Sequence, residues 1–330
     1  MSTDQMEYFK AKYQTLEDIP GVGPSTATKL REIGFKTVEA LATAPIQYLT
    51  TKGIGEATAI KIVVAARKTM ALTFITAEKL YEIQKKKLKM TTGCKSLDNL
   101  FEGGLETQSI TEFHGDFGSG KSQVCQQLAV TVQLPEDRGG LDGACLYIDT
   151  DLTFRPERVI QIAETFDLDP NAVLKRIIYA EAYTSDHQTV LLEGSDEIIK
   201  ENGVRLIIVD SLTGHFRSEY IGREVLAPRQ QKLNQHMHKL IRLARAFNAV
   251  AVITNQMSST PDSFYGKRDT PIGGHIVGHI AHTRVELRKG RGASRSNMRI
   301  AKIIASPFLP EGETPLRITA GGILSDEDIS

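Results

Sequence analysis

The stretch that decides the fold reads Gly115-Asp116-Phe117-Gly118-Ser119-Gly120-Lys121-Ser122. It fits the pattern G-x-x-x-x-G-K-[ST], and it lies between a β-rich run at 109–114 and an amphipathic helical pattern at 123–134. This context is typical of a phosphate-binding loop, because the glycines let successive backbone N–H groups turn inward at a helix N-terminus. We expect Lys121 to reach the terminal phosphates of a nucleotide and Ser122 to place its hydroxyl on Mg²⁺.

Three further polar side chains follow β-rich runs. Asp210 ends the apolar run at 205–210, about ninety residues after the loop, and is the expected second metal-side carboxylate. Asp151 and Gln256 follow two other runs, and residues just past the carboxyl ends of parallel strands face the ligand. Asp151 is therefore expected to orient a water against the γ-phosphate, and Gln256 to sense that phosphate. The alternative for a polar strand end is a helix cap.

Beyond the loop, β-rich runs alternate with helical ones. This predicts an α/β domain whose mostly parallel sheet is flanked by helices. The last three runs alternate polar and apolar residues, which indicates an antiparallel extension at the C-terminal end. The expected strands are 109–114, 144–149, 205–210, 249–255, 283–288, 299–304 and 316–319, and the expected helices are 123–134, 158–166 and 230–247.

The first seventy residues differ from the rest in pattern. Gly21-Val22-Gly23 and Gly53-Ile54-Gly55 each precede a helical pattern, and 35–49 contains short helices broken at Pro45. Such tandem elements resemble helix-hairpin-helix units, whose backbone N–H groups bind DNA phosphates without reading sequence. A plain helix–helix turn is the alternative. The Lys-rich segment 78–89 is expected to be a linker or a solvated helix, with a phosphate-binding patch as the alternative.

Composition narrows the class of protein. The 330 residues are 41% hydrophobic and 24% charged, which is typical of a globular chain of roughly two domains and excludes disordered, collagen-like and disulfide-rich classes. Lys+Arg and Asp+Glu are 40 each, so nucleic-acid binding must come from local patches or backbone donors. The three cysteines form no CxxC pair, and neither a membrane span nor a secretion signal is visible. We therefore expect a cytoplasmic protein with reduced thiols.

Two segments after strand ends are candidate DNA loops. The first runs from 215 to 229 and carries Arg217, Arg223 and Arg229 among aromatic residues. The second runs from 258 to Gly274 and is rich in Gly, Pro and Ser. Loops this long in a compact domain are usually functional or disordered, and Arg with interleaved aromatics suits phosphate contact and base stacking on single strands.

From about residue 16 to about 325 the chain resembles the archaeal RadA recombinases of the RecA/RadA superfamily. The resemblance is carried by the tandem hairpins, the loop at 115–122, and the motifs TFRPER (153–158), RSEY (217–220), RQQKL (229–233), TNQ (254–256), PIGGH (271–275) and LPE (309–311). It implies a RecA-like P-loop ATPase core at 91–330, a small all-α helix-hairpin-helix DNA-binding domain at 1–70, and a linker with a polymerisation motif at 71–90. Archaeal origin and association with the nucleoid would follow.

The resemblance also implies functional residues. Phe74 and Ala77 match the F-x-x-A polymerisation motif, and the receiving surface should include Ala180 and Ala182. ATP would lie between subunits of a filament or ring, bound by the whole loop and the adjoining Gln123. Elsewhere, the resemblance implies that Arg158 stacks on adenine and that the segment Pro307–Pro310 of the neighbouring subunit caps it. His279 would lie near the γ-phosphate across the same interface. The two Arg/Gly loops would line the filament axis and hold single- and double-stranded DNA.

Several positions depart from the family pattern. Asp151 stands where Glu is usual, Ala305 where Asp is usual, Ser122 where Thr is commoner, and Glu181 where Arg is usual. Residues 292–298 look like a small insertion. None of these changes removes a metal ligand or a DNA loop. Asp151 and Ala305 bear on the hydrolysis rate and the cation dependence.

The sequence thus predicts a DNA-dependent ATPase that hydrolyses ATP to ADP and phosphate. It would form filaments on single-stranded DNA and catalyse homologous pairing and strand exchange in recombination and repair. One alternative is a recombinase paralog or mediator that binds ATP without exchanging strands; the departures at Asp151 and Ala305 favour it, whereas the intact hairpin domain, Phe74 motif and loops oppose it. A hexameric helicase of the same superfamily is the second alternative.

Overall fold

The computed structural model describes residues 13, 15–69, 76–85, 87–220, 222, 224–258, 270–272, 274–290 and 297–329. Its contacts divide the chain into two units. One unit comprises the described part of Met1–Lys87 with Glu193–Glu201, and the other comprises Leu88–Leu192 with Asn202–Ser330.

The first unit is helical, as predicted for its N-terminal part. Pro24 and Pro45 stand at helix starts, where the missing N–H of proline costs no hydrogen bond. The core is apolar, with Leu16, Leu30 and Ile62 at most 1% exposed. The elements are η1 (Leu16–Asp18), α2 (Pro24–Glu32), α3 (Val38–Ala42), α4 (Ile46–Thr51), α5 (Glu56–Thr69) and α6 (Ala77–Gln84). No side chain of α6 is buried, which confirms a solvated helix in the Lys-rich segment.

The second unit is built on one large sheet with the order β12-β11-β10-β9-β3-β7-β6-β4-β5. Strands β9, β3, β7, β6, β4 and β5 run parallel, and β10, β11 and β12 extend the sheet antiparallel. The predicted class and the antiparallel extension are confirmed. The strands are β3 (Ile110–Gly115), β4 (Ala144–Asp149), β5 (Ile177–Glu181), β6 (Val204–Asp210), β7 (Val250–Ser258), β9 (Thr283–Lys289), β10 (Met298–Ala305), β11 (Glu313–Thr319) and β12 (Gly322–Leu324), with short pairs at β1 (Lys89–Met90), β2 (Leu105–Glu106) and β8 (Thr270–Pro271).

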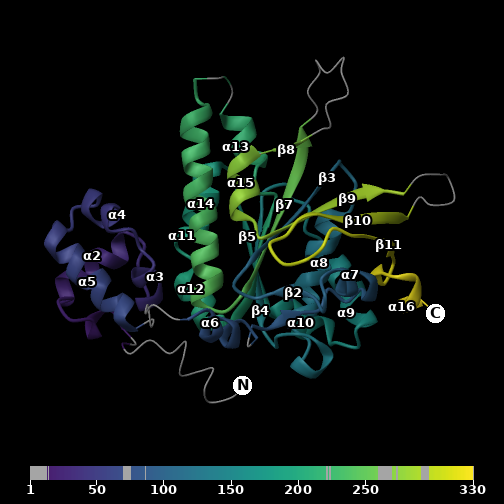
Figure 1. Cartoon of the computed structure of the whole chain (residues 1–330), viewed down its shortest axis with the longest axis horizontal. Coiled ribbons are helices and arrows are strands. Elements are labelled where there is room, and N and C mark those ends of the chain that lie inside the picture. The colour runs from purple at the N-terminus through teal and green to yellow at the C-terminus, as the bar shows by residue number, and fades with distance from the viewer. Residues whose placement is uncertain are drawn as a thin grey trace. The chain divides into compact units, whose positions relative to one another are not determined.

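Helices cover both faces of the sheet. Leu206 and Ile208 of β6 belong to the core cluster that contains residues of α8 and α9. Helix α14 packs against β6 and β7, and Figure 1 shows it on the opposite side of the sheet from α8 and α9. Because both faces are covered, β3, β4 and most of β6 are buried throughout. The helices of this unit are α7 (Lys95–Leu100), α8 (Lys121–Thr131), η2 (Glu136–Arg138), α9 (Pro156–Thr165), α10 (Pro170–Lys175), α11 (Ser185–Glu193), α13 (Gly214–Glu219), α14 (Leu226–Ala246), α15 (Gly274–Ile280) and α16 (Asp326–Ile329). Helix α12 (Asp196–Asn202) belongs, except for its last residue, to the first unit.

The first expected DNA loop is largely helical, so the prediction of a continuous loop at 215–229 is wrong. α13 covers Gly214–Glu219 and α14 begins at Leu226, four residues before the expected helix start. Pro228 lies in the first turn of α14, where a proline needs no donor partner, so it does not delay the helix. Most of the second expected loop lies outside the described residues. The edge strand β5, which pairs only with β4 in the part of the chain that the structure describes, has no counterpart among the predicted strands, because its burial is irregular.

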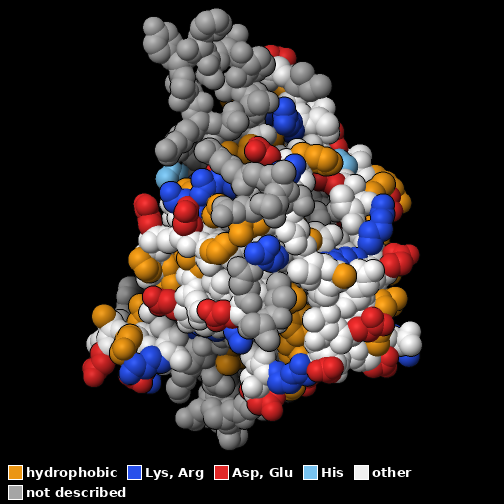
Figure 2. Space-filling model, turned by 90° about the vertical axis from the view of Figure 1, so that its right-hand side faces the viewer, with side chains coloured by type: hydrophobic (Ala, Val, Ile, Leu, Met, Phe, Trp, Pro, Cys, Tyr) orange, Lys and Arg blue, Asp and Glu red, His pale blue; other side chains and the backbone are white. Residues whose placement is uncertain are grey.

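The described helices include none that is both long and apolar enough to cross a membrane. On the face drawn in Figure 2, described Lys and Arg side chains are interspersed with Asp and Glu side chains. This distribution agrees with the net charge of zero. An acidic polymer would therefore have to bind through local contacts and not through an overall positive charge.

Candidate functional site

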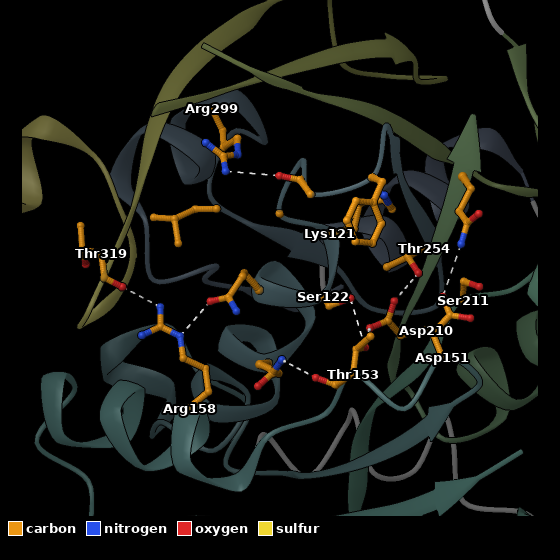
Figure 3. A pocket seen from close by; sticks show the side chains of 17 residues that line it. Lys121, Ser122, Asp151, Thr153, Arg158, Asp210, Ser211, Thr254, Arg299 and Thr319 are labelled. Atoms are coloured by element: carbon orange, nitrogen blue, oxygen red, sulfur yellow. Dashed lines mark hydrogen bonds between the residues drawn. The ribbon is translucent and has the colours of Figure 1, made fainter. Parts of the chain in front are cut away.

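A cavity of about 730 Å³ opens at the carboxyl ends of the parallel strands, where the loop at 115–122 meets the ends of β4, β6 and β7 (Figure 3). The antiparallel strands β10 and β11 close its far side. Its lining consists of Phe117, Gly118, Gly120, Lys121, Ser122, Gln123, Gln126, Asp151, Thr153, Arg158, Asp210, Ser211, Thr254, Gln256, Arg299, Ile318 and Thr319.

The loop leaves no room for side chains at two of its glycines. A Cβ at Gly115 would lie 2.2 Å from the carbonyl oxygen of Leu287, and one at Gly120 would lie 2.9 Å from Cδ1 of Ile318. Gly120 also has φ of +105°, a left-handed conformation that favours glycine. The loop therefore approaches β9 and β11 closely and ends at the first turn of α8, where its N–H groups form an anion cradle.

Lys121 is held inside this cradle. Its Nζ donates to the carbonyl oxygens of Gly115 at 2.9 Å and Asp116 at 3.0 Å. Burial lowers the pKa of Lys121, and the nearby carboxylate of Asp210 opposes that shift. A phosphate oxygen is a stronger acceptor than a carbonyl, so an incoming phosphate can take over the ammonium group.

Asp210 lies at the bottom of the cavity and is 2% exposed. It accepts hydrogen bonds from Tyr147 Oη at 2.8 Å and from the hydroxyls of Thr254 and Ser122. Burial raises the pKa of Asp210, and these three hydrogen bonds oppose the rise. A hydroxyl beside a buried carboxylate at the base of a phosphate cradle matches the oxygen ligands that Mg²⁺ takes in such sites.

Asp151 and Gln256 meet at the open side of the cavity. Gln256 Nε2 lies 3.5 Å from Asp151 Oδ2, and Thr150 Oγ1 donates to Asp151 Oδ1 at 3.3 Å. Asp151 is exposed, so water reaches it directly. The two strand-end residues that the sequence singled out are thus brought together.

Arg158 lies at the opposite end of the cavity, on α9. Its guanidinium donates to Gln123 Oε1 at 2.8 Å, to the carbonyl of Thr319 at 2.7 Å and to that of Ala320. Burial lowers its pKa. These bonds fix the guanidinium at the cavity wall, where Figure 3 shows it between α9 and the end of β11.

Several lining residues were not predicted from the sequence. Gln126 lies one turn after Ser122 on α8 and is 1% exposed, and its Oε1 has no hydrogen-bond partner in the described part of the chain. Its i+4 spacing from Ser122 was the signal that could have identified it. Arg299, which donates to the carbonyl of Gly118 at 3.2 Å, comes from β10, and Ile318 comes from β11.

The remaining predicted residues lie away from this cavity. Arg217 is exposed on α13, Arg229 lies in the first turn of α14, and Gly274 opens α15. Pro307 and His279 are exposed and are not among the described residues that line the cavity. Ala77 opens α6, whereas Phe74 and Arg223 lie outside the described residues. On the edge strand β5, Ala180 is half-buried, and Ala182, just after the strand, is buried.

Comparison with known proteins extends the picture to the whole chain. The sequence model of the Rad51 family matches residues 83–326, and a model described as a SAM-like helix-hairpin-helix tandem matches residues 13–68. The chain is 48% identical over 319 residues to a protein of Aeropyrum pernix named DNA repair and recombination protein RadA. That similarity covers 96% of this chain and 99% of the relative.

Proposed function

The chain belongs to the Rad51 family, and we propose that it is a DNA-dependent ATPase that forms filaments on single-stranded DNA and catalyses homologous pairing and strand exchange. The observation that carries the proposal is the cavity in which a phosphate cradle, a buried Asp210 and the Asp151–Gln256 pair converge. Such an arrangement binds a nucleoside triphosphate and positions a water for attack on its terminal phosphate. The tandem helical hairpins support DNA as the polymer on which the enzyme acts.

Each residue of the cavity has a proposed role. The backbone N–H groups of residues 115–123 and the Lys121 ammonium bind the phosphates, and Arg158 forms the wall for the adenine. Ser122 and Asp210 would hold Mg²⁺, which would neutralise charge on the phosphate oxygens. Asp151 orients the attacking water, and Gln256 contacts the γ-phosphate from the same side.

Assembly is proposed to complete the site. Pro307 and His279 would contact the nucleotide from a neighbouring subunit, since both are exposed and neither lines the cavity of its own chain. Among the described strands β5 is the edge of the sheet, and the segment that carries Phe74 is proposed to add to this edge in a neighbouring subunit. The domains are proposed to be a hairpin domain at 1–70, a polymerisation linker at 71–90 and an ATPase core at 91–330.

A strand-exchange assay run beside an unwinding assay tests the function. The proposal expects ATP-dependent exchange between homologous DNA molecules and no unwinding of a forked duplex. Unwinding without exchange would instead identify a helicase. ATP binding with neither activity would identify a mediator, which the departure at Asp151 would then explain.

The DNA contacts are tested with Arg217→Ala and Arg229→Ala. Each variant should weaken single-strand binding and lower the salt slope of log K by about 0.7, the value for one lost phosphate contact, while ATP binding stays unchanged. Arg245→Ala, an exposed arginine in the last turn of α14, is the matched control. An unchanged salt slope in both variants would exclude this segment from DNA binding.

Assembly is tested with Phe74→Glu. A large apolar residue in a polar linker is unfavourable in water unless a partner buries it, and a charge there opposes burial. The variant should therefore give monomers or short oligomers by light scattering, with an unchanged circular dichroism spectrum. Ile60→Glu, at an apolar residue that is 43% exposed on α5, is the control and should leave filaments intact. Filaments of normal length from the Phe74 variant would contradict this interface.

A further inference from the structure

Asn255, the residue before Gln256, is fully buried and forms four hydrogen bonds, three to other segments and one to the next residue of its own strand. Its Oδ1 accepts from Thr213 Oγ1 at 2.7 Å and from the backbone N–H of Gln256 at 2.9 Å. Its Nδ2 donates to Glu112 Oε1 at 2.9 Å and to the carbonyl of Ile272. The two donor hydrogens and the two acceptor positions of the amide are therefore all used.

The orientation of this amide is determined by two of its partners. The N–H of Gln256 can only donate, and the carbonyl of Ile272 can only accept. A flipped amide would face both with the wrong atom and would leave buried polar groups unsatisfied, which costs free energy for each group. The four bonds thus form one defined arrangement.

The partners of Asn255 connect the nucleotide cavity to both proposed DNA segments. Thr213 is the N-cap residue of α13, the helix that carries Arg217. Ile272 lies two residues before Gly274, the start of α15, and its N–H donates to the carbonyl of Gln256 at 3.0 Å. Gln256 itself contacts Asp151.

The fourth partner anchors this arrangement to the sheet. Glu112 is 0% exposed on β3, three residues before the phosphate loop begins, and its second oxygen accepts from Arg284 Nε on β9. A buried carboxylate that is paired on both oxygens is held firmly, because moving it would expose an uncompensated charge to the core. Asn255 therefore has one fixed neighbour, Glu112, and three neighbours in segments that meet ligands.

We propose that Asn255 is a positioning residue that couples the nucleotide contact of Gln256 to the geometry of both DNA-binding segments. The inference rests on the proposed function. When Gln256 shifts with the state of the γ-phosphate, its backbone N–H pulls on the planar amide of Asn255. The amide transmits that shift to Thr213 and Ile272 together, because all three bonds end on one rigid group. DNA binding in turn changes the nucleotide contact of Gln256 through the same bonds, because coupling between two bound ligands is reciprocal in binding free energy.

Thr213→Val tests the coupling, since it removes one hydroxyl and leaves Asn255 Oδ1 bonded to the N–H of Gln256. We expect ATP affinity and the ATPase rate without DNA to stay within twofold of the wild type. The stimulation by single-stranded DNA should fall about 3- to 10-fold, the range that one neutral hydrogen bond supports. The ratio of DNA affinities measured with a non-hydrolysable ATP analogue and with ADP should shrink by a similar factor. Thr213→Ser, which keeps the hydroxyl, should restore both quantities.

Two controls separate coupling from damage to the fold. Thr283→Val removes a buried hydroxyl on β9 that bonds Ser306 and should leave DNA stimulation unchanged. Thr213→Ala removes the hydroxyl without adding a methyl group and serves as the second variant if Thr213→Val unfolds on heating before the wild type. Wild-type stimulation in a folded Thr213 variant overturns the inference, and so does an equal loss of rate with and without DNA. If the wild type itself shows no DNA stimulation, the proposed function fails instead.

Discussion

Asp151→Asn should slow single-turnover ATP hydrolysis on single-stranded DNA by about 100-fold or more, the usual contribution of a positioned acid–base group. The carboxylate lies at the open side of the cavity, 3.5 Å from Gln256 and within reach of water. The asparagine side chain has the same shape but cannot accept a proton at this position. ATP affinity should change little, because Lys121 and the loop N–H groups dominate binding in the ground state.

Asp151→Glu should change the hydrolysis rate in the opposite direction from Asp151→Asn. Asp is one methylene shorter than Glu, which places its carboxylate roughly 1–1.5 Å further back, and a misplacement of about 1 Å can cost up to about 100-fold in rate. We therefore expect slow hydrolysis in the wild type, with normal ATP-dependent filaments, and a higher kcat in Asp151→Glu. Asp137→Asn, in the short turn η2, is the control for a lost carboxylate. If the wild type and Asp151→Asn hydrolyse ATP at equal rates, another residue must position the water, and Gln256 is the first candidate.

Arg284→Met should lower the free energy of unfolding by about 3–5 kcal/mol, the usual cost of leaving a buried charge without its partner. Glu112 is 0% exposed and pairs with Arg284, whose side chain is 17% exposed. Without the guanidinium, the carboxylate keeps Asn255 as its remaining hydrogen-bond donor among the described contacts. Urea unfolding followed by circular dichroism measures the loss.

Arg288→Met on the same strand is the matched control. Arg288 also forms ion pairs, with Glu286 and Glu313, but its side chain is 44% exposed. Exposed pairs contribute about 0–1 kcal/mol, so this variant should unfold close to the wild type. The double variant Glu112→Met/Arg284→Met should recover much of the lost stability, because no buried charge remains. Equal stability of Arg284→Met and Arg288→Met would contradict a cost of leaving Glu112 buried without its partner.

The sequence was sufficient wherever a feature depends on neighbouring residues. The phosphate loop consists of eight consecutive residues, and its glycines allow the backbone conformation that the loop requires. It lies between a strand and a helix, as predicted. Strand β4 is buried throughout and β6 is buried except at Arg205, and both are near-continuous apolar runs, so their positions were predicted to within about one residue. The resemblance to archaeal RadA recombinases rested on several short motifs at once and is confirmed.

Some elements could not be predicted because their local pattern is weak. Among the described strands, the edge strand β5 pairs only with β4, and it lacks the apolar run of a central strand. The start of α14 was placed too late because Arg and Pro residues at its N-terminus read as a loop, although a proline in a first helical turn is compatible with a helix.

The sequence by itself therefore determined the phosphate cradle, the strand-end carboxylates and the family, because these depend on spacing along the chain and on backbone conformation. The tertiary structure alone decided which distant side chains share the cavity. Arg299 reaches the carbonyl of Gly118 because β9 pairs with β3 and β10 pairs with β9, an order that no local pattern encodes. The same holds for the bond between Thr213 and Asn255, since it exists only because β6 and β7 lie side by side and end at the same edge.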